Sequence, residues 1–133
     1  MWSALEYTAH TRDVMAGNGY LLHKTLQGEG VSIPAISADD AAAASDYNTL
    51  APADVLDDLE ANAGRIAGRA ERASPADWTQ RIRVERDEVL ASLVDHGITD
   101  ALGVLRHAVH EAVHHLDDVQ RNLAAMTRHP EGR

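Results

Sequence analysis

Apolar side chains recur at helical spacing along three long segments of the chain. A repeat of three and four residues places side chains on one face of a helix, so each segment predicts an amphipathic helix. The predicted helices are residues 3–27, 53–73 and 99–128. Ser3 is the predicted N-cap of the first, and in the second acids crowd the start and arginines the end, which complements the helix dipole. The pattern therefore predicts an all-α protein built from packed helices.

The last predicted helix carries the most regular repeat. Its apolar positions alternate by four and three, which is typical of helices packed in a left-handed bundle. These positions are Ile98, Leu102, Leu105, Val109, Ala112, Leu116, Val119, Leu123 and Met126. We expect this seam to face the other helices, and to be the main buried stripe of the last helix.

The segments between the helices carry weaker patterns. Residues 28–52 form a long connection, in which residues 37–44 have the composition of a helical turn or two. Residues 81–85 alternate between polar and apolar, which predicts a short extended piece. Residues 89–94 predict a brief helix that ends at Gly97.

Length, charge and composition narrow the class of protein. A chain of 133 residues is long enough for one domain with a real core, so residues 1–133 are expected to form a single domain. The chain has no cysteine, which excludes disulfides and thiolate metal sites. The net charge of -9 argues against binding to nucleic acid. No apolar run is long enough to span a bilayer, so we expect a cytoplasmic protein without a membrane partner.

Histidines gather in the last predicted helix. His107, His110 and His114 follow each other at spacings of three and four, so their side chains lie on one stripe, nearly opposite the apolar seam. Two imidazoles four residues apart can bind one divalent ion, but a tight site needs a third ligand. The alternative is a hydrophilic outer face that happens to be rich in histidine. His115 lies nearer the seam and is expected to be packed or hydrogen-bonded at the edge of the core.

A further histidine lies in the first predicted helix. His10 has Glu6 one turn before it and Asp13 one turn after it. A histidine flanked by carboxylates is either a member of a surface ion pair or a metal ligand whose ring is oriented by those carboxylates. Spacing alone leaves both interpretations open. Glu111 points about 100° away from His110 on a helix and is not an obvious ligand beside it.

Two motifs about a hundred residues apart carry a family resemblance. The segments Trp2–Asp13 and His110–Asp118 together resemble the DinB-like superfamily, which includes the metal-binding domain of mycothiol-dependent maleylpyruvate isomerases. The resemblance implies an up-down four-helix bundle that holds a divalent metal, such as zinc, nickel or iron, through His10, His110 and His114. It also implies a small-molecule partner, namely a low-molecular-weight thiol such as mycothiol.

The resemblance departs from the family at the start of the chain. Relatives carry a helix before the tryptophan-serine motif, whereas this chain begins inside that motif at Met1. We therefore expect the first helix of the bundle to be missing or truncated, and a homodimer in which a partner chain supplies the lost packing.

Three functions remain open at this point. The first is a metal-dependent transferase or isomerase that acts with a small thiol. The second is a non-catalytic helical protein whose metal site is structural or vestigial. The third is a pH-responsive oligomer in which protonated histidines of the last helix repel each other across an interface. The histidines in question are His107, His110, His114 and His115.

Overall fold

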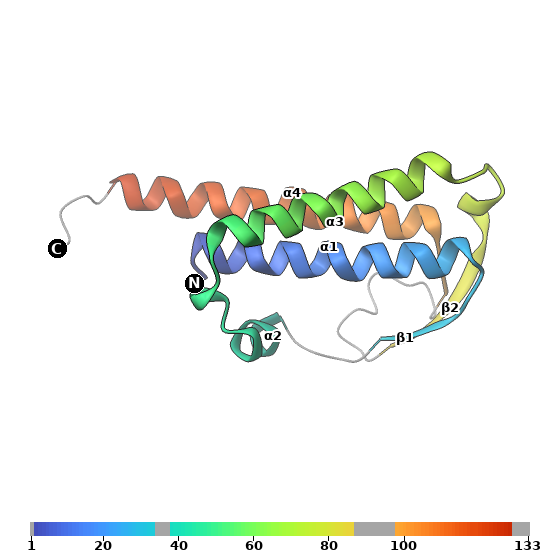
Figure 1. Ribbon diagram of the computed structural model, residues 1–133, viewed down its shortest axis with the longest axis horizontal. Helices are drawn as coiled ribbons and strands as arrows, with labels where there is room; N and C mark the ends of the chain where they lie inside the picture. The colour runs from blue at the N-terminus through green and yellow to red at the C-terminus, as the bar shows by residue number, and fades with distance from the viewer. Residues whose placement is uncertain (1, 34–37, 87–97, 129–133) are drawn as a thin grey trace.

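The computed structural model describes residues 2–33, 38–86 and 98–128, and these residues are mostly helical (Figure 1). They form four α-helices, of which three are long. The helices are α1 (Ala4–Leu26), α2 (Ala38–Ser45), α3 (Pro52–Arg72) and α4 (Ala101–Arg128). The three long helices confirm the three helices predicted from the sequence, to within two residues at each end.

Helix α1 begins and ends where local chemistry dictates. The Ser3 hydroxyl accepts a hydrogen bond from the Glu6 backbone N–H at 3.1 Å, and the Glu6 carboxylate accepts one from the Ser3 N–H at 2.7 Å. This reciprocal capping box satisfies two donors that an α-helix leaves free. At the other end Gly28 adopts a φ of 69°, which glycine reaches without steric cost.

Helix α1 is the central element, and both α3 and α4 pack along it (Figure 1). The main apolar core lies where these three helices meet. Its buried side chains are Met15, Leu22, Ile66, Ala101, Val104 and Ala108. A second cluster joins the start of α1 to α2 and to the 3-10 turn η1 (Tyr47–Thr49). Packing on α1 therefore fixes which faces of α3 and α4 are buried.

The face of α4 that packs on α1 overlaps only in part with the apolar seam predicted from the sequence. Leu102, Val109, Leu116 and Leu123 are between 40% and 58% exposed. The buried positions of α4 are Ala101, Val104, Ala108 and His115. The seam prediction is therefore wrong for the four exposed residues, but its members Leu105 and Ala112 are partly buried and pack against the main core.

A small sheet modifies the all-α prediction. Strand β2 (Arg81–Arg86), which confirms the extended piece expected at residues 81–85, lies between β1 (Val31–Ile33) and β3 (Ile98–Asp100). It runs parallel to β1, with Val31 opposite Val84, and antiparallel to β3, with Ile82 opposite Thr99. The mostly helical class is confirmed, but β1 and β3 were not predicted, since each is only three residues long.

The long connection after α1 contains the helical turns expected at residues 37–44, since α2 lies there. It contains β1, then α2 in the alanine-rich stretch, and then η1. A further 3-10 turn, η2 (Asp77–Thr79), places Trp78 against the main core. The brief helix predicted at residues 89–94 lies outside the described residues. Within residues 2–33, 38–86 and 98–128, no helix combines the length and apolar character needed to cross a bilayer.

Candidate metal centre

The functional side chains lie where the N-terminal half of α1 packs against the middle of α4. His10 comes from α1, and Glu111 and His115 come from consecutive turns of α4. The rings of His10 and His115 meet edge to face, with centroids 4.8 Å apart and planes at 86°. On its other side the His10 ring contacts the Trp2 indole, with centroids 5.1 Å apart. His10 is therefore a half-buried residue wedged between two rings.

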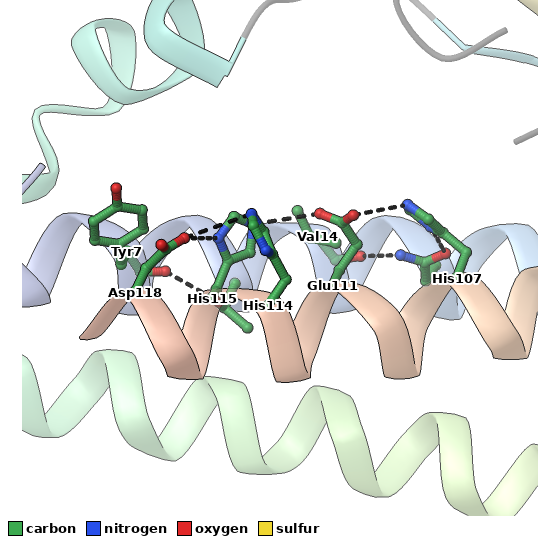
Figure 2. A network of polar contacts seen from close by, with 9 residues as sticks. Tyr7, Val14, His107, Glu111, His114, His115 and Asp118 are labelled. Carbon is green, nitrogen blue, oxygen red and sulfur yellow. Dashed lines mark hydrogen bonds and ion pairs between the residues drawn. The ribbon is translucent and has the colours of Figure 1, made fainter. Parts of the chain in front are cut away.

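Histidines and carboxylates alternate along this side of α4 (Figure 2). The Glu111 carboxylate lies between two rings: its Oε1 is 3.5 Å from His107 Nε2, and its Oε2 is 3.3 Å from His115 Nε2. Asp118 also lies between two rings. Its Oδ2 is 3.5 Å from His115 Nδ1 and 3.6 Å from His114 Nε2. The His115 ring therefore faces both carboxylates, Glu111 through Nε2 and Asp118 through Nδ1.

His115 is buried, yet its two ring nitrogens are not hydrogen-bonded. The residue is 8% exposed, and neither Nδ1 nor Nε2 has a hydrogen-bond partner among the described residues. The nearby carboxylates face these nitrogens at ion-pair distance but do not meet hydrogen-bond geometry. A buried polar atom without a partner costs about 1–3 kcal/mol, so it needs a physical explanation. His115 was expected to be packed or hydrogen-bonded, and the structure shows the packing alone.

The electrostatics keep His10 in its neutral form. Burial lowers the pKa of the His10 imidazole, and the neighbouring His115 lowers it further. The negative charges of Glu111 and Asp13 act in the opposite direction but are smaller effects. A neutral imidazole offers a lone pair, and this is the form that binds metal ions.

Among residues 2–33, 38–86 and 98–128, two groups of side chains are positioned to hold a metal ion. One consists of His10, Glu111 and His115, and the other of His114, His115 and Asp118. In each group the candidate ligand atoms lie within 4.8 Å of one another. The first group fits a cation on chemical grounds, because it brings together a neutral imidazole, a carboxylate and a buried ring nitrogen that has no hydrogen bond.

The histidines proposed from the sequence are distributed differently. His110 and His114 are both exposed, and their rings stack in parallel with centroids 6.1 Å apart. Neither groups with His10 in the described part of the chain, where Glu111 and His115 are the α4 residues beside it. The ligand set of His10, His110 and His114 stays a prediction. The geometry favours the pair one residue further along, which has the same spacing of four.

The remaining polar residues near the centre have partners of their own. His107 Nδ1 lies 2.9 Å from the Asn18 Oδ1 of α1. Asp13, expected to flank His10, accepts hydrogen bonds from the Tyr47 hydroxyl at 2.6 Å and from Arg12 Nε at 2.8 Å. Glu6 belongs to the capping box. The carboxylates on either side of His10 in the sequence therefore do not orient its ring by direct contact.

Sequence reasoning missed Glu111 and Asp118 as candidate ligands. The signal was present, because Glu111 precedes His115 by four residues and Asp118 follows it by three. Glu111 was set aside because it points about 100° away from His110, whereas the α4 histidine beside it in the structure is His115. The chain matches no known protein family, and it matches none of the curated proteins or solved structures compared with it.

Proposed function

We propose that this protein binds one divalent transition-metal ion through His10, Glu111 and His115. The observation that carries the proposal is the buried His115 ring, whose nitrogens lack hydrogen bonds while a carboxylate and a second imidazole lie beside it. A cation shared by these groups would remove the cost of the unpartnered nitrogen. Two imidazoles and one carboxylate are ligands that zinc, nickel and iron(II) all accept.

The surroundings of the three ligands support this assignment. His107 faces the second oxygen of Glu111, and its other nitrogen is held by Asn18. Such outer partners hold a carboxylate ligand in one orientation and commonly accompany metal sites. The ligands come from two helices that pack through a shared core, so the site is preformed rather than assembled on loops.

The reaction class that fits best is metal-dependent chemistry on a small thiol. Three protein ligands leave coordination positions for water or a small molecule. A divalent metal lowers the pKa of a bound thiol or water and so generates a nucleophile near neutral pH. The thiol itself, and the assignment as a transferase or isomerase, depend on the resemblance to the DinB-like superfamily and its mycothiol-dependent members.

A structural metal is the second candidate function, and one observation favours it. His10 is wedged between Trp2 and His115, so a cation there would join the start of α1 to α4. A metal that binds only the folded state raises the melting temperature in proportion to its affinity. In that case the protein is a non-catalytic helical scaffold.

Elemental analysis of protein purified without an affinity-metal step tests the binding proposal. We expect tightly held divalent metal in the wild type, and loss of that metal in His10→Ala, Glu111→Ala and His115→Ala. His110→Ala is the matched control, because it removes an exposed imidazole one residue from Glu111. Full metal content in Glu111→Ala together with its loss in His110→Ala would instead support the set His10, His110 and His114.

Cobalt substitution separates the catalytic proposal from the structural one. Adding a small thiol such as mycothiol to the cobalt-loaded protein should produce an absorption band of a thiolate bound to cobalt. A structural site keeps the same spectrum with and without the thiol. His115→Ala, loaded under the same conditions, controls for cobalt bound elsewhere.

A further inference from the structure

The row of alternating histidines and carboxylates continues beyond the proposed metal centre. His114, His115 and Asp118 form a second group whose candidate ligand atoms lie within 4.8 Å of one another. This group shares only His115 with the first. It lies on the same side of α4, one turn nearer the C-terminus (Figure 2).

The His115 ring presents one nitrogen to each group. Its Nε2 lies 3.3 Å from Glu111 Oε2, and its Nδ1 lies 3.5 Å from Asp118 Oδ2. Both nitrogens are buried without a hydrogen bond. A neutral imidazole carries one N–H, so a cation at Nε2 alone leaves Nδ1 as a buried donor without a well-formed hydrogen bond. The acceptor nearest to this N–H is Asp118 Oδ2, which lies 3.5 Å from Nδ1 and 3.6 Å from His114 Nε2.

Asp118 is arranged as a ligand at this second point. Its Oδ1 pairs with the Arg121 guanidinium, which leaves Oδ2 directed at His115 Nδ1 and His114 Nε2. The His114 side chain is 56% exposed, so this point is open to ions from solvent.

We propose that His114, His115 and Asp118 form a second divalent-cation site, and that the His115 ring bridges the two cations. The inference rests on the proposed function for the first site. When both cations are bound, the remaining ring proton of His115 leaves to solvent, and each ring nitrogen gives its lone pair to one cation. The second site is the weaker one, because Arg121 places a positive charge beside it and His114 is largely exposed.

The number of zinc ions bound per chain tests this proposal. It is measured by zinc titration of the chelator-treated full chain, followed by equilibrium dialysis and elemental analysis. We expect two zinc ions per wild-type chain, the second bound at least about tenfold more weakly, which corresponds to 1.4 kcal/mol. His114→Ala and Asp118→Ala should each retain one, and His115→Leu none. Asp117→Ala is the matched control, because it removes the neighbouring exposed carboxylate and should retain two. Circular dichroism verifies that each variant is folded.

Copper(II) loading tests the bridge independently of the count. Two copper ions joined by one imidazole ring couple magnetically, so the paramagnetic resonance signal per copper should be much weaker in the wild type than in Asp118→Ala. If the wild type binds only one zinc ion per chain, and this ion is lost in His10→Ala but kept in Asp118→Ala, the second site is overturned. The proposed function then still stands. Failure to bind any zinc overturns both. Two bound copper ions with full, uncoupled signals overturn the bridge.

Discussion

The two faces of helix α4 reverse the usual distribution of side chains on an amphipathic helix. The face against α1 carries small or polar residues at its buried positions, which are Ala101, Val104, Ala108 and His115. The outer face carries large apolar side chains that are at least 40% exposed, which are Leu102, Val109, Val113 and Leu116. Hydrophobicity alone therefore does not identify the buried side of this helix.

The difference between the two faces indicates that folding stability is lower where α4 carries the proposed metal centre. Small side chains let α1 and α4 approach closely, and this approach brings the rings of His10 and His115 together. An apolar residue in place of His115 would pack there without unpartnered nitrogens. Positions that break the local rules of packing are expected at functional sites. The inner face of α4 carries the proposed metal centre, whereas the outer face carries exposed apolar side chains.

The largest expected effect concerns the outer face and the homodimer predicted from the sequence. If a second copy covers this face, Val109→Glu combined with Leu116→Glu should change the molar mass in solution from two chains to one. Two charges buried in an apolar interface are strongly unfavourable. Sedimentation equilibrium at micromolar concentration measures this, with Arg106→Glu as an exposed control. A wild type with the mass of one chain contradicts the homodimer.

A matched pair of valines measures the difference between the faces within one chain. Val104 is 3% exposed and Val109 is 58% exposed, and both lie on α4. Val104→Ala should lower the free energy of unfolding by about 2 kcal/mol, because it removes two buried methyl groups. Val109→Ala should change it by less than about 0.5 kcal/mol. Urea denaturation measures both, and equal losses would show that the outer face is buried in solution.

Replacing the shared histidine tests whether it costs stability without metal. In the presence of chelator, His115→Leu should raise the free energy of unfolding by about 1 kcal/mol, since it removes two unpartnered buried nitrogens. His114→Leu is the control, because that side chain is largely exposed and should have little effect. A clear destabilisation by His115→Leu would mean that Glu111 and Asp118 stabilise the ring in the metal-free protein.

Much of the fold was predictable because its long helices carry strong local signals. The capping box at Ser3 and the charge gradient of α3 mark helix ends through contacts within a few residues. The strands β1 and β3 could not be predicted, since three-residue strands are stabilised by pairing with β2 from distant parts of the chain. The buried face of α4 depends on which stripe of its side chains packs on α1. Tertiary packing decides this, and the local sequence does not.

Part of the candidate site could also be predicted, because it depends on local features of the sequence. The sequence identified the two helices and the candidate ligand His10, because a histidine cluster and a paired motif are local features. Through the family resemblance it gave the pair His110/His114, whereas the geometry favours Glu111/His115, which has identical spacing. These pairs differ by one residue, or about 100° of rotation, and only the packing of α1 on α4 distinguishes them.

The smallest expected effect concerns the start of α1, which holds the inner face of α4 in place. Asn122 of α4 donates a hydrogen bond to the Trp2 carbonyl at 2.6 Å, next to the Ser3 cap. Ser3→Ala should lower the free energy of unfolding by about 1 kcal/mol, because it removes the side-chain acceptor of the cap. Ser3→Thr, which keeps a hydroxyl, is the control and should lose less.

Glu6 makes the contribution of this cap depend on pH. The backbone hydrogen bond from Ser3 lowers the pKa of the Glu6 carboxyl below its usual 4.5 in the folded protein. The ionised form is therefore favoured by folding, so its contribution is present above pH 4.5 and is lost as the pH falls through the folded pKa. The difference in unfolding free energy between wild type and Glu6→Gln should shrink accordingly in urea titrations at neutral and acidic pH. A difference that stays constant across this range would show that the Glu6 charge has no part in the cap.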